Sequence, residues 1–362
     1  MIDHAHMAHA LSLAARGLGR VWPNPAVGCV IVKDHRIIGR GWTQAGGRPH
    51  AETMALAQAG LQARGATAYV TLEPCAHHGQ TPPCADALIA AGITCVVTAL
   101  TDPDPRVAGQ GHARLRAAGI EVIEGIQGAQ ATRLNAGFLR KITQNLPFVT
   151  LKLATSLDGR IATASGQSRW ITGPQSRRAV HGLRMRHDAV LIGSGTAIAD
   201  DPDLGVRDLG SAYQPIRIVI DTNLRHNPHS RLGQTAMVSP VWLLHGGTSA
   251  TTARAAWAAT GAILIETPQQ NGHLDLRPAL QALAAKGLTR ILCEGGSMLA
   301  ASLIRANLVN DVAIFTAGAL IGADGHASLA SIGLAALQDA PRASLIETRS
   351  IGPDSFSLWS LT

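Results

Sequence analysis

Segments with strand character alternate with segments of helical character along almost the entire chain of 362 residues. Short apolar runs rich in Val, Ile and Leu are followed by stretches with helical spacing, which is typical of parallel or mixed sheets covered by helices. The chain also exceeds about 250 residues, the size at which a single hydrophobic core usually stops growing. The sequence therefore predicts an α/β protein of two domains.

A polar segment that ends in proline, Thr143–Pro147, divides this alternation into two parts. It precedes a new strand-like run, Phe148–Leu153, and linkers of this kind often mark domain boundaries. We therefore predict one domain over residues 1–145 and a second over 146–362. Strands are expected at 26–32, 66–72, 93–100, 120–123, 148–153, 188–192, 216–221, 241–244, 262–266, 290–294 and 311–316. Helices are expected at 51–63, 84–91, 109–118, 128–141 and 298–305.

The charge and the composition of the chain indicate which kinds of molecule it binds. Lysine and arginine outnumber aspartate and glutamate by 31 to 24, giving a net charge of +7, which raises the question of nucleic-acid binding. The basic residues form no dense run, however, and aromatic residues make up only 3% of the chain, which leaves few stacking platforms for bases. No apolar run reaches the ~18 residues of a transmembrane helix, and the N-terminus lacks a signal-peptide pattern. We expect a cytoplasmic protein that binds small anionic molecules, with no nucleic acid and no membrane as partner.

Two separated segments carry residues suited to activating water with zinc. His50 and Glu52 open a predicted helix, and Cys75 and Cys84 each follow a proline. The pattern resembles the signature of zinc-dependent deaminases, in which three protein ligands leave a fourth position for water. Because zinc lowers the pKa of that water, a carboxylate that is not a ligand can take its proton and pass it to the departing amine. We predict His50, Cys75 and Cys84 as ligands of one Zn²⁺ and Glu52 as the proton shuttle.

The spacing of the two cysteines departs from that signature. Eight residues separate them, whereas nucleobase deaminases have two. Pro83 can restart a helix in its first turn, so that Cys84 is still presented from a helix start. Two alternatives stay open: His77 or His78 as a ligand in place of a cysteine, and a purely structural zinc site. The open set of three ligands beside a glutamate favours catalysis.

A loop asparagine adds to this candidate site. Asn24 lies between two prolines before a strand-like run, and its amide can both donate to and accept from a pyrimidine edge. Pro-Asn-Pro is also ordinary loop chemistry, but beside the deaminase pattern we take Asn24 as a substrate-binding candidate. The remaining cysteines, Cys29, Cys95 and Cys293, lie in apolar runs and are expected to be inert core residues.

Two glycine-rich turns follow strand-like runs in the second half. Gly193–Thr196 follows one run, and Glu294–Ser297 follows another and opens a helix. Backbone N–H groups at such turns can hold phosphate, although Ile198 stands where a full G-x-G-x-x-G motif has its third glycine. Asp221 ends a strand, where it either bonds a ribose or caps the next turn. We expect a dinucleotide site outside the standard Rossmann pattern.

Arginines near the first of these turns are candidates for binding a substrate phosphate. Guanidinium groups make bidentate contacts with phosphate, which suits Arg184, Arg186 and Arg207 in this loop-rich region. The alternative is a surface lattice of ion pairs with the neighbouring aspartates. Trp170 follows a Ser–Arg pair in the same region, and we expect its indole to line a cleft.

Seven short motifs are spread over nearly the whole chain: Pro23–Gly28, His50–Glu52, Glu73–Cys84, Asp102–Val107, Lys152–Gly159, Asp201–Leu204 and Glu294–Ser297. Together they resemble the bifunctional riboflavin-biosynthesis deaminase–reductase family, which has the same eight-residue cysteine spacing. That family joins an N-terminal diaminohydroxyphosphoribosylaminopyrimidine deaminase to a C-terminal 5-amino-6-(5-phosphoribosylamino)uracil reductase.

The resemblance implies a cytidine-deaminase-like α/β/α sandwich followed by a dihydrofolate-reductase-like α/β domain, with one zinc ion in the first and NADPH in the second. It implies a pyrimidine ribotide, 2,5-diamino-6-(5-phosphoribosylamino)pyrimidin-4-one, as the substrate, which is deaminated and then reduced at its ribosyl group. The implied cofactor positions are Ala154, Trp170, Thr196, Asp200, Thr222, Gly296 and Ser297. The implied reductase substrate positions are Ser168, Arg184, Leu204, Arg207 and Glu294.

Two other classes of protein stay open. A nucleic-acid-editing deaminase would bind single strands in a strongly salt-dependent way, and a non-catalytic scaffold stapled by zinc would unfold on chelation. The motifs are compatible with a homo-oligomer, but the oligomeric state and the stereochemistry of hydride transfer do not follow from them.

Overall fold

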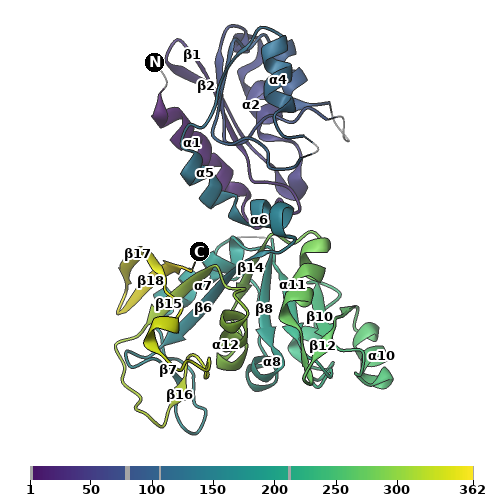
Figure 1. The fold of residues 1–362 in the computed structure, drawn as a ribbon, viewed down its shortest axis with the longest axis vertical. Coiled ribbons are helices and arrows are strands. Elements are labelled where there is room, and N and C mark those ends of the chain that lie inside the picture. Colours follow the sequence, from purple (N-terminus) through teal and green to yellow (C-terminus); the bar gives the residue numbers. More distant parts are fainter. Residues whose placement is uncertain (1–2, 78–81, 106, 211–212, 362) are drawn as a thin grey trace. The chain divides into compact units, whose positions relative to one another are not determined.

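The computed structural model describes residues 3–77, 82–105, 107–210 and 213–361, and the chain divides into two compact units, Met1–Asn145 and Leu146–Thr362 (Figure 1). Each unit is built around its own sheet with helices packed on it. The two units confirm the predicted α/β class.

The first unit contains a five-stranded mixed sheet with the order β2-β1-β3-β4-β5. β1 pairs antiparallel with both β2 and β3, whereas β3, β4 and β5 run parallel. The strands are β1 (Gly28–Lys33), β2 (Arg36–Trp42), β3 (Thr67–Val70), β4 (Cys95–Thr98) and β5 (Glu121–Ile123). The helices are α1 (His4–Ala14), α2 (Ala51–Ala59), α3 (Cys84–Ala90), α4 (Gln110–Ala117), α5 (Gly128–Leu134) and α6 (Ala136–Gln144).

Helices cover both faces of this sheet, because successive strand residues point to opposite sides. Cys29 and Ile31 pack with apolar residues of α2, α3 and α4, such as Leu88. Val30 and Val32 pack on the other face with residues of α1 and α5. The result is the α/β/α sandwich expected for this unit.

Strand β2 is absent from the sequence-based prediction, and its glycines explain how α2 packs against it. A β-carbon on Gly41 would lie 2.0 Å from the carbonyl oxygen of Ala51, and one on Gly39 would lie 2.3 Å from that of Ala55. The missing side chains therefore let α2 lie directly on this edge strand.

The helix expected at 51–63 is shorter than predicted, because α2 ends at Ala59 and a 3₁₀ turn, Gly60–Ala63, follows it.

The second unit contains a nine-stranded sheet with the order β11-β10-β9-β8-β14-β6-β15-β18-β17. The strands from β11 to β15 in this order run parallel, and β18 and β17 add an antiparallel hairpin at one edge. The sheet strands are β6 (Phe148–Thr155), β8 (Ala189–Gly193), β9 (Ile216–Ile220), β10 (Val241–His245), β11 (Ile263–Glu266), β14 (Arg290–Cys293), β15 (Asp311–Thr316), β17 (Ser344–Ile351) and β18 (Asp354–Ser360).

Helices follow most of the parallel strands of this unit. They are α7 (Pro174–Met185), α8 (Ser194–Asp200), α9 (Arg231–Gln234), α10 (Thr251–Ala259), α11 (Leu276–Ala285) and α12 (Ser297–Arg305). Two further strand pairs lie outside the main sheet: β7 (Arg160–Ala162) with β16 (His326–Ala327), and β12 (Gln269–Gln270) with β13 (His273–Leu274). Within the described part of the chain, no helix combines the length and the apolar character that crossing a bilayer requires.

Candidate active sites

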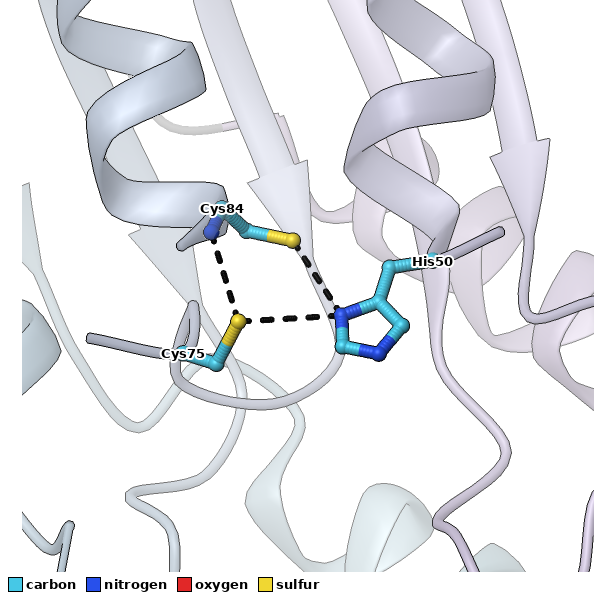
Figure 2. A group of neighbouring side chains, drawn as sticks. All are labelled: His50, Cys75 and Cys84. Carbon is cyan, nitrogen blue, oxygen red and sulfur yellow. Dashed lines mark hydrogen bonds between the residues drawn. The ribbon is translucent and has the colours of Figure 1, made fainter. Parts of the chain in front are cut away.

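A histidine and two cysteines meet in the first unit (Figure 2). The Nδ1 atom of His50 lies 3.3 Å from Sγ of Cys84 and 3.6 Å from Sγ of Cys75, and the three ligand-type atoms all lie within 4.8 Å of one another. Within the described ranges, no other group of three such residues is close enough to share a metal ion.

Local structure explains how residues 34 positions apart converge. His50 is the N-cap residue of α2, Cys75 follows β3, and Cys84 is the first residue of α3 after Pro83. The backbone N–H of Cys84 donates to Sγ of Cys75 over 3.3 Å. Although eight residues separate the two cysteines, Cys84 still lies at the start of a helix, as in the deaminase signature. Its sulfur therefore lies beside the ligand-type atoms of His50 and Cys75.

The geometry fits a zinc ion. With Zn–S of about 2.3 Å and Zn–N of about 2.0–2.1 Å, a tetrahedral site has S···N edges of about 3.6 Å. The observed distances of 3.3 and 3.6 Å match such edges. Hydrogen bonding from Cys84, together with that from His50, lowers the pKa of the Cys75 thiol to about 4, which favours its thiolate form. A thiolate is the form of cysteine that binds metal.

Glu52 lies in the first turn of α2, next to this cluster, and its side chain is buried. Burial raises the pKa of its carboxyl to about 7, with a further contribution from the charge on Cys75. A carboxyl that titrates near neutral pH can both accept and return a proton during one reaction cycle.

The substrate candidate Asn24 and the alternative zinc ligand His77 lie outside the cluster of His50, Cys75 and Cys84. Asn24 is half-buried, and its Nδ2 donates to the carbonyl of Val21 over 3.3 Å. His77 is exposed and stands apart from the cluster of His50 and the cysteines. The alternative ligand His78 lies outside the described residues, as does Arg106 of the Asp102–Val107 motif.

Glu73 ties a loop to the cysteine segment, a role that the sequence did not reveal. Its buried carboxylate accepts four backbone N–H bonds from the segment that leads into α4 and from the first turn of that helix. The donors are Asp102 at 3.0 Å, Gly109 at 2.9 Å, Gly111 at 2.7 Å and His112 at 3.2 Å. A β-carbon on Gly111 would lie 2.0 Å from the carbonyl oxygen of Pro74, so the loop also packs directly against the residue before Cys75.

The two glycine turns of the second unit lie side by side. They follow β8 and β14, which are neighbours in the sheet. The backbone N–H of Gly296 donates to Oγ1 of Thr196 over 3.0 Å, and a β-carbon on Gly295 would lie only 2.7 Å from the nitrogen of Gly193. The structure therefore brings together the cofactor candidates Thr196, Gly296 and Ser297.

The remaining cofactor candidates lie at the same edge of the sheet. Ala154 is near the carboxyl end of β6, and Thr222 follows β9, so both share an edge with the glycine turns. Ligands of open α/β sheets bind at this edge. Asp200 ends α8, and its carbonyl accepts from the guanidinium of Arg169 over 2.7 Å, which joins it to the segment of Trp170.

Arg184 and Glu294 form a bidentate ion pair at this edge. Nε of Arg184 lies 2.6 Å from Oε1 of Glu294, and Nη2 lies 3.0 Å from Oε2. Nζ of Lys152 is 3.8 Å from the same carboxylate. Burial alone would raise the pKa of Glu294, but Arg184 and Lys152 together lower it to about 2. Lys152 therefore belongs to this charged cluster. The sequence analysis named it only within the motif Lys152–Gly159 and gave it no role.

The other substrate candidates of this unit differ in exposure, as does the cofactor candidate Trp170. Arg184 also donates to the carbonyl of Gly205 over 2.8 Å, so its guanidinium is engaged by the protein on two sides. Leu204 is buried in the core, whereas the side chain of Arg207 is exposed. Ser168 is half-buried, and the indole of Trp170 is exposed with the guanidinium of Arg177 4.6 Å from its ring centroid.

Asp221 is a turn cap. Its side chain is only 1% exposed, and Oδ2 accepts the backbone N–H of His226 over 2.7 Å. Of the two roles that the sequence left open, the structure supports the cap through this hydrogen bond. Of the residues that follow Asp221, Thr222 is half-buried and Arg225 is exposed.

Family models match both units of the chain. Residues 1–100 match the cytidine and deoxycytidylate deaminase zinc-binding region, and residues 147–356 match the RibD C-terminal domain. Together with the site geometry, these matches define a two-domain enzyme that joins a zinc-dependent deaminase to a reductase. The chain belongs to the RibD family, and it is a bifunctional deaminase and reductase of riboflavin biosynthesis.

The similarity extends over nearly the full length of the following relatives. The chain is 45% identical to the riboflavin biosynthesis protein RibD of Escherichia coli (strain K12), with 98% of each chain covered. It is 37% identical to RibD of Aquifex aeolicus, with 98% of this chain and 97% of the relative covered. The solved structure of Acinetobacter baumannii RibD, form 1, matches with a TM-score of 0.89 at 39% identity, covering 99% of this chain and 98% of that one. The deaminase/reductase of Thermotoga maritima matches with a TM-score of 0.86 at 33% identity and the same coverage.

Proposed function

We propose that the first unit deaminates 2,5-diamino-6-(5-phosphoribosylamino)pyrimidin-4-one and that the second unit reduces the product with NADPH. Water adds to the pyrimidine carbon that bears the exocyclic amine, and ammonia leaves. Hydride then reaches C1′ of the ribosyl group, which is open to attack when the N-glycoside opens to an imine. The cluster of His50, Cys75 and Cys84 beside buried Glu52 is the observation that carries the first step.

In the deaminase, the three ligand residues would hold one zinc ion, and zinc supplies an acidified water at neutral pH. Glu52 would accept one proton from the attacking water and give it to the ring nitrogen, and would then accept the second proton of the same oxygen and give it to the departing amine. Its raised pKa of about 7 supports both transfers. Asn24 binds the pyrimidine edge, because its amide offers a donor and an acceptor together.

In the reductase, the adjoining glycine turns bind cofactor phosphates through their backbone N–H groups. Ala154, Trp170, Asp200 and Thr222 complete the cofactor site around them. NADPH is favoured over NADH because Asp221 is buried and Arg225 is exposed beside Thr222, which leaves a cation and no free acid for the ribose 2′ position.

The substrate of the reductase lies next to the pair of Arg184 and Glu294. We assign its phosphate to Arg207, because this guanidinium is exposed whereas Arg184 is engaged with Glu294 and Gly205. Ser168 and Leu204 line the same site, the latter through its backbone since its side chain is buried. Catalysis of hydride transfer then depends on positioning of the two reactants.

A single assay tests both halves. The diaminopyrimidinone ribotide is supplied to the purified chain with or without NADPH, and ammonia release and NADPH oxidation are followed together. Ammonia should appear in both cases, and NADPH should be consumed only after deamination has begun. NADPH consumption without ammonia release, or equal use of NADH, would contradict the proposal.

We also propose that the protein is located in the cytoplasm, which fractionation of the source cells would test.

A further inference from the structure

Gly47 lies against the amide of Asn24, three residues before His50. A β-carbon built on Gly47 would lie 2.0 Å from Nδ2 of Asn24, 2.6 Å from Cγ and 3.0 Å from Cβ. Non-bonded heavy atoms do not approach this closely, so any side chain at position 47 displaces the asparagine or the turn. The amide occupies the space that a side chain at position 47 would fill.

The turn that carries Gly47 has little freedom to move away. The N–H of Gly47 donates to the carbonyl of Gln44 over 2.9 Å, and the N–H of Gln44 donates to the carbonyl of Pro49 over 3.1 Å. Gly47 itself is buried. On the other side, Nδ2 of Asn24 donates to the carbonyl of Val21 over 3.3 Å. The amide is therefore held by the carbonyl of Val21 and by its contact with the backbone at Gly47.

We propose that Gly47 is a positioning residue of the deaminase: its lack of a side chain seats the Asn24 amide against the turn that leads to His50. The amide thereby meets the pyrimidine edge in a fixed orientation relative to the metal-binding cluster. This inference rests on the proposed function, in which Asn24 binds the pyrimidine. It adds a residue that acts through the position of Asn24.

The chain offers a matched control in the neighbouring glycine. Gly46 has a φ of +75° and Gly47 a φ of +87°, so both adopt the left-handed backbone conformation that side chains disfavour. A β-carbon on Gly46 meets no atom within 4 Å. Gly46→Ala therefore introduces a similar backbone strain without contact to Asn24.

The experiment compares Gly47→Ala with Gly46→Ala in the full chain. We expect Gly47→Ala to raise the KM for the diaminopyrimidinone ribotide by about 10-fold over Gly46→Ala, the size of effect expected when one hydrogen bond is lost. Zinc content, and NADPH-dependent reduction of ribotide supplied already deaminated, should be equal in the two variants. In an Asn24→Ala background, adding Gly47→Ala should change the KM no further, because its target is gone.

The outcomes separate this inference from the function on which it rests. If Asn24→Ala leaves the ribotide KM unchanged, the proposed role of Asn24 is wrong and the inference falls with it. If Asn24→Ala raises the KM but Gly47→Ala behaves like Gly46→Ala, the inference alone is overturned. If Gly47→Ala loses zinc, the double variant decides: restored zinc supports a clash with Asn24, and continued loss overturns it.

Discussion

Replacing Glu294 by glutamine is expected to destabilise the second unit in a pH-dependent way. The carboxylate is largely buried between Arg184 and Lys152, and its pKa of about 2 lies well below the ordinary value of 4.5. At 1.36 kcal/mol per pH unit, this difference corresponds to about 3 kcal/mol of stability at neutral pH. Glutamine keeps the shape but removes the charge, which leaves two buried cations without their counter-ion.

The sign of the pH dependence follows from the lowered pKa. A carboxylate whose pKa is depressed on folding contributes its stability fully above the unfolded pKa and loses it as the pH falls through the folded value. The contribution of Glu294 should therefore be complete above about pH 4.5 and disappear towards pH 2. For a domain of this size, about 3 kcal/mol corresponds to a Tm lower by roughly 6–12 °C at pH 7.

Scanning calorimetry at pH 7 and at pH 3 measures this effect. Glu266→Gln is the matched control, since Glu266 is an exposed residue at the end of β11, and it should shift the Tm by less than about 2 °C. The Glu294→Gln deficit should shrink at pH 3. An equal loss in both variants, or a deficit of the same size at both pH values, would refute the reasoning.

Four further variants test the sites. Cys75→Ser and Cys84→Ser should each purify with much less than one zinc per chain, and metal analysis showing full zinc in both would contradict the ligand assignment. Glu52→Gln should retain zinc but lose ammonia release by at least ~10²-fold while still reducing deaminated ribotide; loss of both activities would indicate misfolding instead. Arg207→Ala should raise the ribotide KM of the reductase by ~10- to 100-fold and that of NADPH little, and an unchanged ribotide KM in steady-state kinetics would remove Arg207 from the site.

The sequence predicted the central strands well because they are apolar on both faces. Two edge strands, β2 and β17, were not predicted, and each has an identifiable reason. In β2, Gly39 and Gly41 look like breakers, yet they form the surface on which α2 packs. In β17, almost every residue is exposed, so neither alternation nor an apolar run marks it.

The candidate zinc site could be found from the sequence because its residue types are rare and its chemistry demands them. The contacts that support it could not. The Glu73 carboxylate bonds N–H groups at least 29 positions away, and the amide of Asn24 packs on a glycine 23 positions further on. Backbone donors and absent side chains leave no compositional trace, so such contacts become visible only when the chain is folded.

The four N–H groups that surround the Glu73 carboxylate also determine where proline is permitted in that loop. Proline has no N–H and cannot supply any of these bonds. The chain already has prolines at positions 103 and 105, and neither of these positions is among the four donors. A proline at Gly109 or His112 would instead leave a buried charge one donor short. Which positions of this segment accept proline thus depends on which backbone N–H groups point at Glu73. Single proline substitutions along the segment should therefore be destabilising at the donor positions and tolerated better between them.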